Sequence, residues 1–184
     1  GRLGHEYYNK LGYVPQKAVM FNGTVTSNIE YGDNGKQKPT MEQVKKAIEV
    51  AQGTEFVEKM DNSYNAHIAQ GGTNISGGQK QRLAIARAVA RDPEIYIFDD
   101  SFSALDFKTD AKLRQELNQL VKKTKSTVLL VGQRIASIMD ADQIIVLDEG
   151  RIVGKGTHGE LMKSCQVYQE IAYSQLSKEE LSHE

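Results

Sequence analysis

Short apolar runs alternate with helical patterns in the second half of the chain, and this alternation constrains the fold more than any other feature. The runs are IYIF (95–98), TVLLVG (127–132) and QIIVLDEG (143–150), with amphipathic stretches between them. Parallel strands need a long crossover connection, commonly a helix, so the alternation predicts a largely parallel sheet. An earlier run, LGYVP (11–15), predicts one more strand, which Pro15 ends.

Helical patterns with clear start and stop signals lie in the first half of the chain. Thr40 and Gln43 have the spacing of a capping box ahead of MEQVKKAIEVAQG, which predicts a helix there. Thr54 opens a second, shorter helix, and KQRLAIARAVARD predicts a third helix that ends before Pro93.

The remaining stretches carry turn and loop signals. Residues 17–35 and 61–79 are polar and rich in glycine, which predicts loops, the second of them long enough to be functional. RIVGKGT (151–157) can form a hairpin with the last apolar run, and a helical region closes the chain.

Length and composition fit one globular domain. The chain has 184 residues, of which 39% are hydrophobic and 26% charged. Its 23 basic and 24 acidic residues give a net charge of −1, which provides no general attraction to nucleic acid or to an anionic membrane. The single cysteine, Cys165, excludes an internal disulfide framework and predicts a packing role. With no signal peptide and no apolar run of about 20 residues, we expect this chain to be soluble, although it can belong to a longer membrane protein.

Two adjacent acids, Asp99 and Asp100, follow the apolar run 95–98. Neighbouring side chains on a strand point to opposite faces, so the two carboxylates cannot do the same job. The alternative for Asp100 is a solvated loop acid without a specific role.

The tetrapeptide Ser76-Gly77-Gly78-Gln79 stands at the start of a predicted helix. A helix N-terminus offers free N–H groups and the positive end of the helix dipole, and glycines let the backbone approach an anion closely. The pattern therefore predicts a phosphate-binding site that uses no lysine. The alternative is an ordinary glycine turn with a serine cap.

The order of these features resembles the ATP-binding cassette (ABC) ATPases over nearly the whole chain. SGGQ is similar to the signature motif of that family, IYIFDD to its Walker B strand, and SALD, ending in Asp106, to its D-loop. YVPQ, ending in Gln16, is similar to the Q-loop, AQGG to the X-loop of exporters, and Gln133 occupies the switch position.

The resemblance implies an α/β, P-loop NTPase-like fold with a mostly parallel sheet and a helical subdomain. That subdomain would span about 26–92, and the ATPase core would comprise 1–25 and 93–184. The lysine loop of the family, G-x-x-x-x-G-K-[ST], is absent from the sequence. We therefore expect an N-terminally truncated ABC domain whose strands at 95–98 and 127–132 lack a neighbour. By itself it is expected to be marginally stable and inactive.

The resemblance also implies a role for each site residue. Asp99, with Gln16, would hold Mg²⁺, and Asp100 would polarise the attacking water where the family has a glutamate. Gln133 stands where the family has a histidine. These two departures resemble the degenerate subunit of heterodimeric exporters. The residues expected to contact ATP are Gln16, Ser76, Gly77, Gly78, Gln79 and Asp106.

The function implied is that of an ATP-binding and ATP-hydrolysing motor domain of an exporter, at the cytoplasmic face of the cell membrane. Its partners would be a second, non-identical nucleotide-binding domain, which sandwiches ATP with it, and the transmembrane domain of the full-length chain. No nucleic-acid partner is expected. Two alternatives stay open, namely a regulatory ATP-binding module with little hydrolysis and a soluble ABC-type ATPase of DNA repair or translation.

Overall fold

The computed structural model describes residues 10–32, 37–132 and 134–182, and it divides the chain into two compact units. The first unit ends at Val131 and the second begins at Gly132. The predicted helical subdomain at about 26–92 lies within the first unit, and its boundaries stay a prediction.

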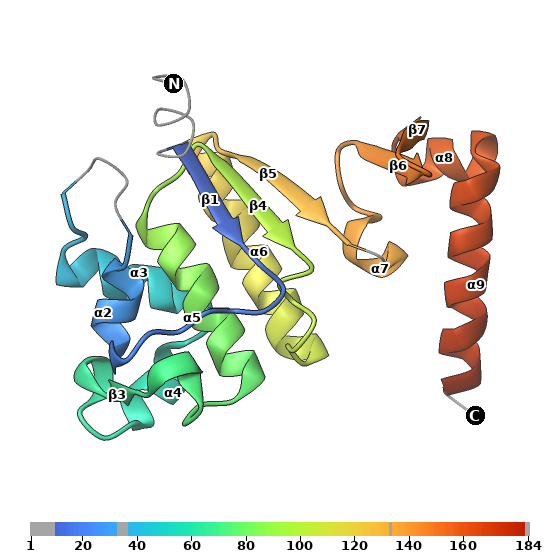
Figure 1. The fold of residues 1–184 in the computed structure, drawn as a ribbon. Helices are drawn as coiled ribbons and strands as arrows, with labels where there is room; N and C mark the ends of the chain where they lie inside the picture. Colours follow the sequence, from blue (N-terminus) through green and yellow to red (C-terminus); the bar gives the residue numbers. More distant parts are fainter. Residues whose placement is uncertain (1–9, 33–36, 133, 183–184) are drawn as a thin grey trace. The chain divides into compact units, whose positions relative to one another are not determined.

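The first unit contains a three-stranded parallel sheet (Figure 1). Its strands are β1 (Leu11–Val14), β4 (Ile95–Asp99) and β5 (Thr127–Val131), in the order β1-β4-β5. The predicted parallel arrangement of these strands is confirmed.

The expectation that the strand at 95–98 lacks a neighbour is wrong. This strand, β4, is the central one, because β1 pairs with it on one side and β5 on the other. Among the described residues, β5 pairs with β4 alone, so the expectation of a missing neighbour applies only to β5.

The two faces of this sheet differ in their cover. Val14, Tyr96 and Phe98 lie on one face and are buried in the main core cluster, together with residues of α5 (Gly77–Ala90) and α6 (Phe107–Thr124). On the other face the apolar side chains remain partly open, with Leu129 and Val131 each 49% exposed. Parallel sheets are ordinarily covered on both faces, so this half-open apolar face is unusual.

The other α-helices that the structure describes at full length in the first unit are α2 (Val25–Glu30), α3 (Met41–Val50) and α4 (Thr54–Lys59). The predicted capping box of Thr40 and Gln43 is present at the start of α3. The loop predicted at 17–35 is wrong for α2, which begins after a capping box of Thr24 with Ser27. These two residues were the signal that the glycine-rich surroundings obscured.

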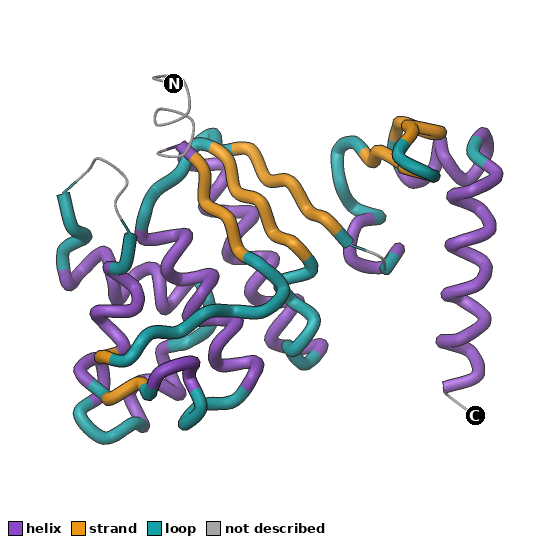
Figure 2. Tube along the Cα trace, in the orientation of Figure 1, coloured by secondary structure: helices purple, strands orange, loops and turns teal. Residues whose placement is uncertain are grey.

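The loop predicted at 61–79 contains only short elements before Gly77. They are the 3-10 turns η1 (Ser63–Asn65) and η2 (Gln70–Gly72) and the strand β3 (His67–Ile68), which pairs with β2 (Gly23–Thr24). Helix α5 then begins at Gly77, inside the predicted loop. In Figure 2 the stretch between α4 and α5 includes several loop segments, which are drawn in teal.

The second unit contains α7 (Ile135–Ile138), β6 (Ile144–Asp148), β7 (Arg151–Gly156), α8 (His158–Ser164) and α9 (Gln166–Ser182). Strands β6 and β7 form the predicted antiparallel hairpin. The expectation that the run 143–150 joins the parallel sheet is wrong, because among the described residues β6 pairs with β7 alone. The packing role predicted for Cys165 is confirmed, because this residue is buried in a small core with Ile144, Leu161 and Tyr168. Among the described residues, none of the helices combines the length and apolar character needed to cross a bilayer.

Candidate functional site

The two acids at the end of β4 have different partners. Asp99 is the last residue of the strand, and its Oδ2 accepts a hydrogen bond of 3.2 Å from the hydroxyl of Tyr13. Asp100 has a φ of 49°, in the left-handed region that aspartate tolerates better than most residues. Its Oδ2 accepts a hydrogen bond of 3.2 Å from Nε2 of Gln16. The two carboxylates are thus held separately, as their adjacent positions in the sequence predict.

Tyr13 is a site residue that the sequence motifs did not reveal. It pairs with Ile97 across β1 and β4, which places it on the same face of the sheet as Asp99, two residues further along. Desolvation and the neighbouring carboxylate of Asp99 both raise the pKa of the Tyr13 hydroxyl above its ordinary value, which already keeps the hydroxyl protonated at neutral pH. The register of the two strands was the signal, and it is visible only once the strands are paired.

A buried serine ties the loop after β4 to the end of β1. Ser101 is completely buried, and its hydroxyl donates a hydrogen bond to the carbonyl oxygen of Val14. The carbonyl of Val131 accepts a hydrogen bond of 2.8 Å from the N–H of Asp100. The acids therefore stand on a backbone that both neighbouring strands hold in place.

The predicted phosphate-binding tetrapeptide, hereafter the α5 tip (76–79), forms a capping box. Ser76 Oγ accepts from the N–H of Gln79 at 3.1 Å, and Gln79 Oε1 accepts from the N–H of Ser76 at 3.0 Å. The helix geometry leaves the N–H groups of Gly77 and Gly78 without an acceptor inside the helix. Ser76 and Gly77 are exposed, so these donors can meet an anion from outside the chain.

The α5 tip packs against the SALD segment (103–106). A Cβ atom added at Gly78 would lie 3.0 Å from the carbonyl oxygen of Ala104, whereas one added at Gly77 would make an ordinary contact of 3.8 Å with the Ala104 side chain. Packing inside this chain therefore disfavours a side chain at 78 but leaves room for one at 77. A requirement for glycine at 77 would have to come from a ligand or a partner.

Asp106 at the end of the SALD segment caps α6. Its Oδ1 accepts from the N–H of Thr109 at 2.8 Å, and its Oδ2 accepts from the Thr109 hydroxyl at 2.9 Å. These hydrogen bonds lower the pKa of the Asp106 carboxyl, with a smaller contribution from the charge of Arg82. The contact of Asp106 with ATP stays a prediction, and its capping role is an additional reason for an acid at this position.

Helix α5 also holds the segment that follows Gln16. Arg87 donates to the carbonyl oxygens of Asn28 and Val19, each at 2.8 Å, and burial lowers the pKa of its guanidinium to about 10. The same guanidinium lies over the rings of Phe21 and Tyr31, which stack with centroids 4.1 Å apart. The segment after Gln16 is therefore fixed to the helix that carries the α5 tip.

A second residue that the motifs did not reveal is Gln81. It lies on the buried side of α5 with Ala84, Ile85 and Ala88, and only 4% of it is exposed. A polar residue within an apolar helical stripe was the signal, since a buried amide needs hydrogen-bond partners. Gln133, the predicted switch residue, lies outside the described residues.

The donor set at the end of the sheet suits Mg²⁺. Within the described ranges, His, Cys, Asp and Glu side chains form no group of three or more that could hold a metal ion. Asp99 and the amide oxygen of Gln16 are hard oxygen donors, and the bond from Gln16 to Asp100 uses the amide nitrogen instead. Because Mg²⁺ commonly takes one or two protein ligands and fills its shell with phosphates and water, these two residues fit it as a partial site.

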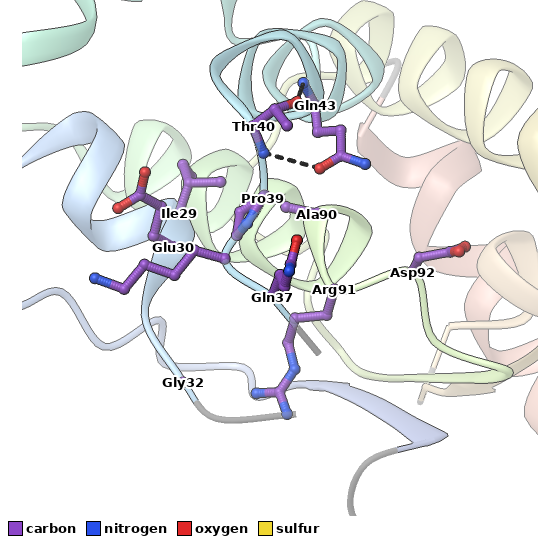
Figure 3. A pocket seen from close by; sticks show the side chains of 11 residues that line it. Ile29, Glu30, Gly32, Gln37, Pro39, Thr40, Gln43, Ala90, Arg91 and Asp92 are labelled. Carbon is purple, nitrogen blue, oxygen red and sulfur yellow. Dashed lines mark hydrogen bonds between the residues drawn. The ribbon is translucent and has the colours of Figure 1, made fainter. Parts of the chain in front are cut away.

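A separate pocket of about 410 Å³ lies between α2, the segment before α3 and the end of α5 (Figure 3). Its lining includes Glu30, Lys38, Thr40 and Arg91, and Figure 3 shows the capping hydrogen bonds between Thr40 and Gln43 at its edge. None of the predicted site residues is among those that line it.

Comparison with known proteins agrees with this geometry. Residues 4–103 match the model of the ABC transporter family, which covers more than half of the chain. The chain therefore belongs to the ABC transporter family, and both the predicted family and the predicted ABC ATPase fold are confirmed.

Relatives lie among bacterial and mitochondrial transporters. An uncharacterized ABC transporter ATP-binding protein of Mycobacterium tuberculosis is 47% identical over 91% of this chain, and the mitochondrial iron-sulfur clusters transporter atm1 of Aspergillus fumigatus is 40% identical over 88%. A solved structure of a bacterial Atm1-family ABC exporter with ATP bound matches 89% of the chain with a TM-score of 0.82 and 33% identity.

The chain spans only part of these relatives. It covers 28% of the Mycobacterium protein, 22% of the Aspergillus transporter and 28% of the exporter chain in the solved structure. The matched portion is the ATP-binding part of ABC exporters.

Proposed function

We propose that this chain is the ATP-binding motor domain of an ABC exporter and that its α5 tip closes over ATP held by a second nucleotide-binding domain. The observation that carries the proposal is the exposed start of α5, where Gly77 and Gly78 present N–H groups without intrahelical acceptors. A triphosphate fits such a place because the helix dipole and the N–H groups both favour a negative charge. Bound ATP then stabilises the contact between the two domains, and its hydrolysis lets them separate.

The chain's own nucleotide would be served by the residues at the ends of β1 and β4. Gln16 and Asp99 are the residues that would hold Mg²⁺ there, and the bound ion would neutralise charge on the phosphates. The hydroxyl of Tyr13 orients the Asp99 carboxylate through its hydrogen bond, and Ser101 holds the backbone beneath it.

We also propose that ATP is hydrolysed slowly at the chain's own nucleotide site, hereafter the own site. Asp100 is one methylene shorter than glutamate, and its carboxylate is engaged by Nε2 of Gln16. A general base must lie within hydrogen-bond reach of the water that it activates, so the shorter side chain is a handicap. Gln133 adds a second handicap, since a neutral amide can donate to a phosphate but cannot become cationic. We therefore expect a non-identical partner that supplies the faster site.

A second candidate, a regulatory ATP-binding module, is favoured by the same hydrogen bond. If the Asp100 carboxylate stays bound to Gln16 when ATP is present, it cannot take a proton from water, and the own site only holds its nucleotide. Hydrolysis that depends on Asp100 separates this candidate from the motor.

A P-loop nucleotide site uses a lysine loop, which we propose is supplied by a segment outside this sequence. The half-open sheet face with Leu129 and Val131, each 49% exposed, and the single pairing of β5 both support an additional strand and cover at this place. Such a segment would supply the P-loop, and it would also stabilise the domain by covering the sheet.

The membrane domain of the full-length protein is the second partner that we propose, and it would put this chain at the cytoplasmic face of the membrane. Val19 and Tyr31 are 51% and 52% exposed on the segment after Gln16, which Arg87 fixes to α5. Exposed apolar side chains on a segment so firmly held suit a docking surface. Movement of the membrane domain would reach Gln16 through this segment.

The test uses Gly77→Ala in the full-length protein, assembled with its partner in a membrane. The chain itself has room for this methyl group, so folding should be unaffected, while the approach of the triphosphate to the helix start is blocked. We expect steady-state ATP hydrolysis to fall at least about tenfold. Gly159→Ala is the matched control, because Gly159 also lies in the first turn of a helix and an added Cβ meets nothing within 4 Å. Equal activity of the two variants would refute the proposal.

A further inference from the structure

The side-chain amide of Gln81 joins two loops that stand far apart in the sequence. Its Nε2 donates to the carbonyl oxygen of Gln16 at 3.2 Å and to Oγ of Ser103 at 3.1 Å. Its Oε1 accepts from the N–H of Ala104 at 2.9 Å. Every polar atom of this buried amide is therefore engaged, which fixes its position and that of both loops.

Each loop that Gln81 holds carries part of the proposed machinery. On one side, the carbonyl of Gln16 is held by Gln81 while the side chain of Gln16 donates to Asp100. On the other side, Ser103 and Ala104 begin the SALD segment, against which the α5 tip packs at Gly78. The Gln81 amide is thus hydrogen-bonded to the SALD segment on one side and, on the other, to Gln16, whose side chain binds the Asp100 carboxylate.

We propose that Gln81 is a positioning residue that couples the SALD segment to Gln16. The inference rests on the proposed function, in which the SALD segment and the α5 tip meet the partner's nucleotide while Gln16 and Asp100 meet the chain's own. A shift of the SALD segment on closure over the partner's ATP moves the Gln81 amide, and the Gln16 carbonyl moves with it. The hydrogen bond from Gln16 to Asp100 is then set by the occupancy of the opposite site.

Two substitutions at Gln81 separate the two links. Gln81→Glu keeps the length of the side chain, and its carboxylate can still accept from Ala104 and from a rotated Ser103 hydroxyl. In its ionised form the carboxylate would face the carbonyl of Gln16, which has no proton to donate, so the ionised variant breaks the link to Gln16 alone, and the measurement is made at a pH that keeps the carboxylate ionised. Gln81→Met has a similar length and breaks both links.

The control variant is Ile85→Val. Ile85 is completely buried on the same helix, one turn further on, and its apolar side chain forms no hydrogen bonds with either loop. It reproduces a modest loss of core stability without touching the coupling.

The experiment is single-turnover ATP hydrolysis by the assembled full-length transporter, followed by quenched flow. The phase that Asp100→Asn removes belongs to the chain's own site. We expect Gln81→Glu to slow this phase at least about fivefold and to leave the other phase within about twofold, whereas Gln81→Met slows both. Adding Gln81→Glu to Gln16→Ala should give no further loss in this phase, because the amide acts through Gln16.

A Gln81→Glu variant that behaves like Ile85→Val, or that multiplies the effect of Gln16→Ala, overturns the inference. If no phase depends on Asp100, amide hydrogen exchange of the ATP-bound transporter tests the inference instead. Residues 14–18 should then exchange at least about fivefold faster in Gln81→Glu while residues 102–106 stay unchanged, and equal exchange at 14–18 overturns the inference. Failure of the proposed function itself is recognised separately, because Gly77→Ala would then retain full activity.

Discussion

Nε2 of Gln16 donates a hydrogen bond of 3.2 Å to Oδ2 of Asp100, which joins the loop after β1 to the residue that follows β4. The contact brings together two residues that lie 84 positions apart in the sequence. It places the candidate base of the own site under the control of the loop that we propose is connected to the membrane domain. We therefore propose that this hydrogen bond connects the coupling to the membrane domain with the chemistry of the site.

Lengthening the second acid should restore chemistry at the own site. Asp100→Glu extends the carboxylate by one methylene toward the position of the attacking water, and we expect own-site hydrolysis to rise about tenfold in the assembled transporter. Asp100→Asn is the matched variant, since it keeps the size of the side chain and removes the base. Own-site rates that are identical in all three proteins would favour the regulatory module over the motor.

The two glycines of the α5 tip should differ in their effect on stability. An added methyl group at Gly78 would press on the carbonyl oxygen of Ala104 at 3.0 Å, so Gly78→Ala should lower the free energy of unfolding by about 1–3 kcal/mol. Gly77→Ala should leave it within about 0.5 kcal/mol, because the space is open and alanine favours helix. Thermal unfolding of the full-length variants checks this, and equal melting temperatures would contradict the packing that we describe.

The cap of α6 should make stability depend on pH at the acid end. The Thr109 hydrogen bonds lower the pKa of Asp106 in the folded chain. Its contribution is therefore fully present above the unfolded pKa of about 4 and is lost as the pH falls through the folded value. Asp106→Asn keeps a capping side chain but has no charge to titrate. The stability difference between wild type and this variant should shrink on acidification below about pH 4, and a constant difference would contradict the role of the carboxylate.

The half-open sheet face should prove to be covered in the full-length protein. Leu129 is 49% exposed in this chain, and a charge placed there would cost little if the face stayed in water. If another segment covers it, Leu129→Asp should destabilise the intact protein by about 2–4 kcal/mol, because an unpaired charge is then buried. Gln119→Asp, at an exposed position of α6, is the control. Equal melting temperatures for the two variants would count against the missing cover.

The elements that the sequence predicted correctly are those whose signals are local. The apolar run at 95–98 and the capping pair Thr40 and Gln43 each mark an element through neighbouring residues, and the structure contains both. Helix α2 was missed because it is short, lies among glycines and contains β-branched residues with low helix propensity. The position of β4 between β1 and β5 depends on contacts distant in sequence, which periodicity does not encode.

The residues of the candidate site also fall into a group that the sequence predicted and a group that it did not. The motifs predicted Gln16, Asp99 and Asp100 as site residues, and the structure brings them to the same end of the sheet. The contacts of Tyr13 and Gln81 were not predicted, because they follow from strand register and from packing of α5 on two loops. Neither residue was singled out by a recognised sequence motif, so their contacts become visible only in the folded chain.

The most direct test is the structure of the full-length transporter, assembled with its partner and trapped with a non-hydrolysable ATP analogue. The account predicts that the N–H groups of Gly77 and Gly78 lie within hydrogen-bond distance, about 3 Å, of the terminal phosphate of the partner's nucleotide. A trapped complex in which these N–H groups face water, with no phosphate within reach, would contradict it.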